Sequence, residues 1–296
     1  LIQYKFLHLK LNKSNLIKMK NTILSLMFLA SSFAFAQVQT PQPSPSAQLS
    51  QTVGLTEVTV KYSRPSKKDR DIFGALVPFG KIWRTGANQN TIISFGDAVT
   101  IGDKEIAAGA YAIYTRPGKT TWEVFFYNDI TNWGNPAEWD TSKVAASIEV
   151  PAVETDEMQS FEIWISNLHN NGATLNIGWS TTMVSVPFGV PTVAKATASI
   201  LEVMKNDPKD RDYYNAAVYY LQEGQDLNQA KAWIAKAIAV NGEAYWYFRQ
   251  QSLILAGLND VDGAVAAAKS SLALATKAGN TDYITLNEAS LAEWTK

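Results

Sequence analysis

Six basic side chains gather in one short stretch of the sequence, and their chemistry suits the binding of an anion. Only Asp69 and Asp71 oppose them within residues 64–84. The six are Arg64, Lys67, Lys68, Arg70, Lys81 and Arg84. A guanidinium group binds a carboxylate or a phosphate through two parallel hydrogen bonds. With the aromatic and amide side chains beside it, the stretch predicts a ligand-binding site made of Tyr62, Arg64, Arg70, Trp83, Arg84 and Asn88.

The same arginines also have a structural interpretation, which the sequence leaves open. Arg64 ends a predicted strand, and the chain then makes a long excursion before it returns at residues 83–88. We expect the return to bring Arg84 and Asn88 near Arg64. If an acid of the chain lies between the two arginines, the cluster is a structural lock, and otherwise it awaits an anionic ligand. The acids available for this role are Asp69, Asp71 and Glu57.

A second candidate site lies in the loop DITNWGNPAEWD, and its members are Asp129, Trp133, Glu138, Trp139 and Asp140. Tryptophan rings beside acids suit a carbohydrate, because the rings stack on sugar faces and the acids bind hydroxyls or cleave the glycosidic bond. The same oxygens suit Ca²⁺, although their spacing matches no EF-hand. In a third interpretation, the two tryptophans only anchor a long loop on the sheet.

Several classes of function are excluded by composition. The chain has no cysteine, which excludes a disulfide framework, a thiol nucleophile and a cysteine-ligated metal. Its formal net charge of −1 argues against general nucleic-acid binding. We expect no cofactor and no resident metal. Of the two histidines, His8 falls in a segment that we expect to be removed, and His169 falls at a predicted hairpin tip, where a catalytic role is not expected.

The residues that could do chemistry fall in a region that reads as β-structure, residues 51–190. Val58, Val60 and Tyr62 alternate with polar residues, as in a half-buried strand. Further strands are predicted at 91–95, 98–101, 110–115, 121–127, 143–150, 160–167, 174–179 and 183–187. Gly102-Asp103, Pro117-Gly118 and Asn171-Gly172 suit the turns of hairpins. Many short strands separated by turns predict an antiparallel β-sandwich or barrel. Within residues 67–90 we expect a short helical turn at 71–76 and then a structured loop.

Residues 191–296 read as a second, α-helical domain. Helices are predicted at 192–206, 210–224, 227–240, 243–257, 260–277 and 281–294. A shift of 34 residues aligns Tyr213 with Tyr247 and Ala230 with Ala264, which is the tetratricopeptide (TPR) period. The prediction is therefore an α+β protein of two domains, with TPR-like hairpins after a β-sandwich-like domain. The aromatic surface of the hairpins suits a protein partner.

The first residues have the features of export rather than of a fold. Residues 19–36 combine a basic start, a short apolar run and Ala34-Phe35-Ala36 before Gln37, which predicts a secretory signal peptide. We interpret residues 1–18 as mistranslated upstream sequence and residues 37–50 as a Pro- and Ser-rich linker. The predicted location is periplasmic or extracellular, with no membrane span after removal of the signal.

Several runs of the sequence resemble a family of exported bacterial proteins that is catalogued as domain of unknown function 2911. The runs are YSRP (62–65), RDIFGALVPFGKIWRTGAN (70–88), AGAYAIY (108–114), WEVFFYN (122–128) and WG (133–134). The resemblance spans about residues 43–188 and implies an exported β-rich domain without a known ligand. The family usually has an acid after the GAN run, where this chain has Gln89.

Two functions remain open from the sequence. The first is an exported binding or scaffold protein, because no catalytic constellation is recognisable and a helical repeat suits protein contacts. The alternative is a hydrolase that acts on a glycan or an anionic envelope substrate, through the acids and tryptophans of residues 129–140. The sequence does not decide whether the protein is an enzyme.

Overall fold

The computed structural model describes residues 40–296. The chain divides into two compact units, residues 1–45 and residues 46–296, and the folded elements below belong to the second. The predicted upstream segment, the signal peptide and the first residues of the linker lie outside the described residues. Within residues 40–296, no helix has both the length and the apolar character needed to cross a membrane.

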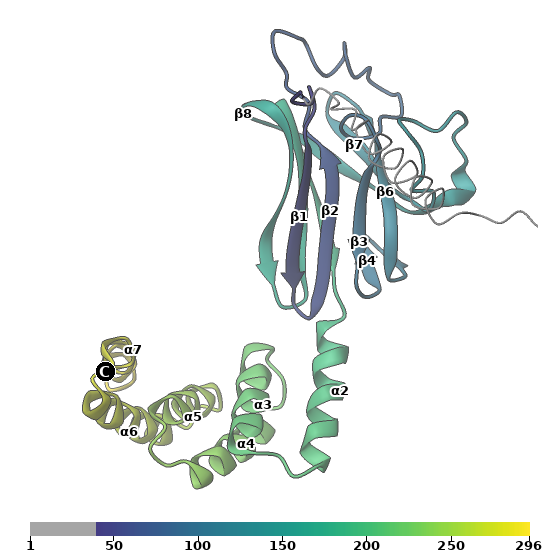
Figure 1. Ribbon diagram of the computed structural model, residues 1–296. Coiled ribbons are helices and arrows are strands. Elements are labelled where there is room, and N and C mark those ends of the chain that lie inside the picture. Colours follow the sequence, from purple (N-terminus) through teal and green to yellow (C-terminus); the bar gives the residue numbers. More distant parts are fainter. Residues whose placement is uncertain (1–39) are drawn as a thin grey trace, which may run out of the picture. The chain divides into compact units, whose positions relative to one another are not determined.

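Nine antiparallel strands form one sheet in the order β1-β2-β3-β6-β7-β8-β9-β4-β5 (Figure 1). The strands are β1 (Ser46–Val53), β2 (Thr56–Ser63), β3 (Thr91–Phe95), β4 (Val99–Ile101), β5 (Lys104–Ile106), β6 (Gly109–Pro117), β7 (Thr121–Tyr127), β8 (Val144–His169) and β9 (Gly172–Gly189). The antiparallel β-region is confirmed. The linker prediction is wrong for its last part, because β1 begins at Ser46 and pairs along its whole length with β2.

Two long strands, β8 and β9, replace four short ones that the sequence predicted. β8 pairs with β7 up to Pro151 and with β9 from Ala152 onward, so that one strand serves both halves of the sheet. Three shifts of register interrupt the β8–β9 pairing, and such bulges let a strand bend without breaking. The sheet therefore folds over on itself, and its two halves enclose one core.

Alternating apolar residues of both halves fill this core. In β2, Val58 and Val60 are fully buried, while Thr59 between them is only partly buried and Glu57 and Lys61 on either side are exposed. Phe161 of β8 and Ile177 and Trp179 of β9 belong to the same buried cluster. The period of two that is visible in the sequence is thus the direct cause of the sandwich-like packing.

The segment between β2 and β3 is fixed at both ends by backbone hydrogen bonds. At its start, the amides of Phe161 and Lys67 donate to the carbonyls of Pro65 and Gln159. At its end, Trp83 and Thr115 exchange two hydrogen bonds, of 2.8 and 2.9 Å. The excursion is therefore paired with β8 on one side and with β6 on the other.

The helical turn predicted at residues 71–76 is wrong. The amide of Val77 donates to the carbonyl of Ile72, and the amide of Gly74 donates to the carbonyl of Val77, which closes a compact loop instead. Gly74 has a φ of 91°, which an L side chain rarely adopts. The glycine and the loop closure override the helical spacing of the apolar residues.

Six helices follow the sheet: α2 (Thr192–Lys205), α3 (Asp210–Gln222), α4 (Leu227–Val240), α5 (Tyr245–Gly257), α6 (Val261–Ala278) and α7 (Thr281–Trp294). The first residues of α4 and α6, Leu227 and Val261, are 34 positions apart, as the predicted period requires. Ala230 and Ala264, which the period aligns, are both fully buried. Small residues at equivalent positions thus let successive helices approach one another.

Trp83 is the centre of the aromatic packing in the core. Its ring stacks on Trp179 at 6.1 Å and meets Phe161 edge to face at 5.4 Å. Phe73 and Trp122 complete the cluster around it. We expect Trp83→Ala to lower the free energy of unfolding by about 3–5 kcal/mol, because it leaves a cavity among these rings. Guanidinium denaturation measures the change.

The matched control for Trp83→Ala is Leu76→Ala in the same segment. Leu76 is 47% exposed, and we expect a change of no more than about 0.5 kcal/mol. Equal losses in the two variants would contradict a central role for Trp83.

Candidate functional site

Tyr62 and Arg64 bind the second half of β8 through its backbone. The Tyr62 hydroxyl donates to the carbonyl of Ile163 and accepts from its amide, at 3.2 Å in both cases. Arg64 donates from Nε to the carbonyl of Phe161 at 3.0 Å and pairs with Glu162 at 3.5 Å. The acid that serves Arg64 is therefore Glu162, which the sequence analysis did not consider.

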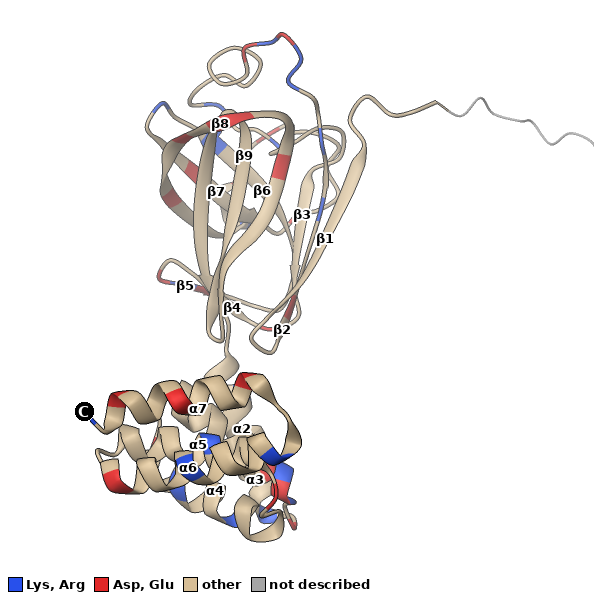
Figure 2. Cartoon of the chain, turned by 90° about the vertical axis from the view of Figure 1, so that its left-hand side faces the viewer, with Lys and Arg blue, Asp and Glu red and all other residues tan. Residues whose placement is uncertain are grey.

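Two more members of the basic stretch are also engaged by the chain itself. Lys67 pairs with Glu157 at 3.0 Å, and Arg70 donates to the backbone carbonyls of Lys67 and Ser66. Figure 2 shows the acidic residues along β8, two of which are these partners of Arg64 and Lys67. The start of the excursion is thus held by its own basic residues, as in the structural interpretation.

The return of the excursion brings one predicted residue to the end of β2. Asn88 donates from Nδ2 to the Ser63 hydroxyl at 3.4 Å, and it has a φ of 60°. Gly86 lies so close that a Cβ there would be 3.1 Å from the carbonyl oxygen of Ser63. The expected approach to the end of β2 is therefore made by Asn88 and Gly86.

Arg84 has different surroundings from Arg64. Its Nη1 lies 3.1 Å from the position that a Cβ on Gly134 would occupy, in the loop of residues 128–143. Its Nε is buried and has no hydrogen-bond acceptor among the described residues. One N–H donor is therefore left without an acceptor where Arg84 meets this loop.

Two hydrogen bonds join residues 82–90 to residues 132–135, a third joins β6 to Gly134, and we call this region the loop junction. Asn135 donates from Nδ2 to the carbonyl of Ile82 at 2.8 Å, and the backbone amide of Asn90 donates to the carbonyl of Asn132 at 3.5 Å. The hydroxyl of Tyr114, on β6, donates to the carbonyl of Gly134 at 3.4 Å. Burial raises the pKa of Tyr114, which keeps this hydroxyl a donor.

The two tryptophans of the second candidate set have opposite environments. Trp139 stacks on Tyr127 at 4.8 Å and meets Phe125 at 5.0 Å, so it anchors the loop on the outer face of the sheet. Trp133 is 75% exposed. The anchoring interpretation thus accounts for Trp139 and leaves Trp133 without a structural role.

The acids of this loop are used by the loop itself. Asp129 pairs with Lys143 at 2.9 Å and accepts from the amide and the hydroxyl of Thr131. Asp140 accepts from the amide of Ser142 at 2.9 Å and caps a short 3₁₀ turn. Glu138 is exposed. Within residues 40–296, no three His, Asp or Glu side chains gather as a metal site would require.

A polar groove of about 510 Å³ runs beside the loop junction. It is lined by Ser46, Ala47, Gln48, Lys61, Tyr62, Ser63, Gln89, Asn90 and Ile92. Asn90 belongs to both the groove and the loop junction. Sequence reasoning missed the wall formed by β1, because its polar composition suggested a linker.

His169 lies at the exposed end of the β8–β9 hairpin, as predicted, and its Nδ1 accepts from the amide of Asn171. Asn170 and Asn171 form the turn and both donate to Glu223, just after α3, at 2.5 and 2.6 Å. These bonds lower the pKa of Glu223. The hairpin tip therefore joins the sheet to the helices.

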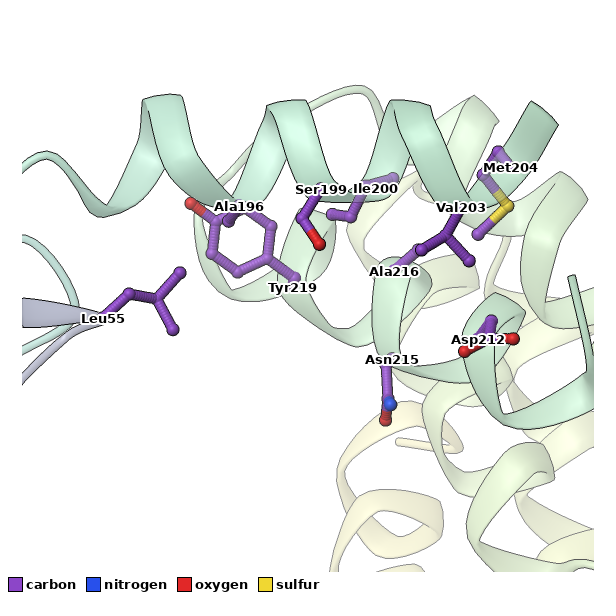
Figure 3. Close-up of a pocket in the computed structure, with 10 residues that line it drawn as sticks. All are labelled: Leu55, Ala196, Ser199, Ile200, Val203, Met204, Asp212, Asn215, Ala216 and Tyr219. Carbon is purple, nitrogen blue, oxygen red and sulfur yellow. The ribbon is translucent and has the colours of Figure 1, made fainter. Parts of the chain in front are cut away.

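A groove of about 280 Å³ lies between α2 and α3, and Leu55 of the turn between β1 and β2 also lines it (Figure 3). Ile200, Val203 and Met204 line it from α2, and Tyr219 lines it from α3 with a buried hydroxyl that has no partner among the described residues. The groove is compatible with contact to a protein partner. A protein partner of the helical domain stays a prediction.

We expect Asp129 to give the protein a dependence of stability on pH in the acid range. The Lys143 ammonium and the donors of Thr131 lower the pKa of Asp129 from 3.8 to about 2. The stabilisation is therefore fully present above the unfolded value of 3.8 and is lost as the pH falls through about 2. Asp129→Asn should flatten the curve of unfolding free energy against pH in this window.

Lys143→Met is the companion variant, because it removes the largest cause of the lowered pKa of Asp129. It should weaken the same part of the pH dependence. An Asp129→Asn variant that keeps the slope of the unchanged protein would show that this ion pair does not act in solution.

Comparison with known proteins gives a family but no function. Residues 44–188 match the family model described as "Protein of unknown function (DUF2911)". No curated protein and no solved structure matches the chain. The matched range covers all of the sheet except the last residue of β9, and it contains both the basic stretch and the loop junction. The β-sheet region of this chain, residues 44–188, therefore belongs to the DUF2911 family.

Proposed function

We propose that this is an exported binding protein that holds an anionic ligand, a carboxylate or a phosphate, at the loop junction. The observation that carries the proposal is the guanidinium of Arg84, whose Nε is buried without an acceptor. A buried donor that is left unpaired costs about 1–3 kcal/mol, and more when the group is charged. An anion at this position would remove that cost.

The basic residues divide into two groups, and this division supports Arg84 as the ligand-binding residue. Arg64, Lys67 and Arg70 are satisfied by acids or carbonyls of the chain. Within the described residues, no ion pair joins Arg84 or Lys81 to an acid. The lock of the structural interpretation therefore accounts for the first part of the basic stretch, and the ligand site is proposed for the second part.

Binding is favoured over hydrolysis by the state of the nearest carboxylates. Asp129 is held in the charged form chiefly by Lys143, and Asp140 is held in it chiefly by hydrogen bonds from the hydroxyl and the amide of Ser142. A glycoside hydrolase needs one acid with a raised pKa to protonate the leaving group. The pKa values of Asp129 and Asp140 are both lowered.

Arg84→Met tests the proposal directly. The variant removes an unpaired buried donor, so we expect its thermal stability without ligand to be unchanged or raised. The stabilisation by added inorganic phosphate or acetate that we expect for the unchanged protein should be lost. Differential scanning fluorimetry in a buffer free of carboxylates and phosphate measures both effects. Arg84→Lys should retain part of the response, because it keeps the charge but loses the planar fork.

Arg70→Met is the matched control, since Arg70 binds only backbone carbonyls of its own turn. It should keep the response to anions. A loss of stability in Arg84→Met with an intact response to anions would contradict the proposal and make Arg84 a structural residue.

The exported location is the second part of the proposal, and it rests on the signal sequence of residues 19–36. We expect the protein recovered from the cell envelope or the medium to begin at Gln37. Intact mass measurement gives the N-terminus. Recovery of a chain that retains residues 19–36 in the cytosol would overturn this part and would leave the anion site untouched.

A further inference from the structure

We propose that the anionic ligand is an acidic saccharide, whose sugar ring stacks on Trp133 while its acid group pairs with Arg84. The inference deepens the proposed function and rests on it. It combines two observations that are independent of each other, the exposed indole ring and the unsatisfied guanidinium.

Trp133 is exposed although no packing contact of the described residues requires it to be. Its 75% exposure compares with 37% for Phe79, the other aromatic residue on the surface of the described part of the chain. Its companion Trp139 anchors the loop. Leaving a large apolar ring in water forgoes the favourable free energy of burial, which a ligand can recover by covering the ring.

The exposed ring is held on a fixed backbone. Gly134 and Asn132 accept hydrogen bonds through their carbonyls, from the Tyr114 hydroxyl and the Asn90 amide, on either side of Trp133. Asn135 is tied to the carbonyl of Ile82. The backbone at Trp133 therefore loses little freedom when a ligand binds, and such preorganisation favours affinity.

Arg84 lies against the residue next to Trp133 in the sequence. The 3.1 Å separation between its Nη1 and the missing Cβ of Gly134 leaves no easy room for a larger residue there. Gly134 also has a φ of 93°, a conformation that favours glycine. The Arg84 guanidinium therefore contacts the residue that follows Trp133, and we expect a ligand that covers the ring to reach it.

The chemistry of the neighbours favours a sugar over the other ligands that stack on tryptophan. A cationic ligand would be repelled by Arg84. Trp133 makes no ring contact with another aromatic residue of the described part, so no second wall forms a slot for a nucleobase. The exposed side chain of Asn135, two residues from Trp133, can accept a hydrogen bond from a hydroxyl group through its amide oxygen. A ligand that has a ring to stack on Trp133, hydroxyl groups and one acid group is a uronic acid or another acidic sugar.

The test uses the full-length protein and trimers of galacturonate, glucuronate and mannuronate, with maltotriose as the neutral counterpart and AMP as the nucleotide. Isothermal titration calorimetry gives the affinities. We expect at least one acidic trimer to bind more tightly than maltotriose, acetate and AMP. Trp133→Ala should weaken that binding roughly tenfold, as expected for the loss of one stacking contact. The variant should keep its melting temperature and its response to phosphate.

The outcomes separate this inference from the proposed function. A Trp133→Ala variant that binds the acidic trimers as well as the unchanged protein does would overturn the inference alone. Equal binding of maltotriose, or tighter binding of AMP, would also overturn it. Binding of none of the acidic trimers by a protein that still responds to phosphate through Arg84 counts against the saccharide only. The absence of any Arg84-dependent response to anions would overturn both.

Discussion

The pair of backbone hydrogen bonds between Trp83 and Thr115 is the constraint on which the rest of the β-domain depends. It fixes the end of a long excursion to the central strand β6 and places the Trp83 ring among Phe161 and Trp179 of the two long strands. The following residue, Arg84, then has its position determined by the core rather than by its own contacts. The backbone of Arg84 is thus held in place although its Nε has no acceptor among the described residues.

Local patterns in the sequence were enough to predict the class of fold. The alternation in β2 depends only on neighbouring residues, and it is confirmed together with the helical character of the region after the sheet. The continuity of β8 could not be predicted, because Pro151 and the acids that follow are typical of strand ends. Its bulges are stabilised by the partner strand β9, and that contact is not encoded locally. β1 was missed because an edge strand can be almost entirely polar when its partner supplies the pairing.

The candidate site was predictable in its parts but not in its assembly. Residue types alone pointed to Arg84 and to Trp133, in two motifs separated by five strands. The contact of Arg84 with Gly134, the residue after Trp133, depends on the loop of residues 128–143, which Trp139 anchors on the sheet. The pairing of Arg64 with Glu162 was out of reach for the same reason, since its partner comes from the far half of the sheet. The density of basic residues in the sequence therefore predicted too large a binding site, because half of these residues bind other parts of the chain.

Gln89 makes the groove beside the loop junction less negatively charged than an acid at the same position would. Its side chain lines the groove together with Lys61 and Asn90, which belongs to the loop junction as well. The resemblance to the family places an acid at this position. A carboxylate there would repel an anion and could only accept hydrogen bonds, whereas an amide can donate them. With glutamine at position 89, none of the side chains that line the groove is negatively charged, so none of them repels an anionic ligand. The glutamine, at a position where the family usually has an acid, therefore supports an anionic ligand at Arg84. The same residue would weaken a proposal of catalysis, because a carboxylate that could act as a base is missing.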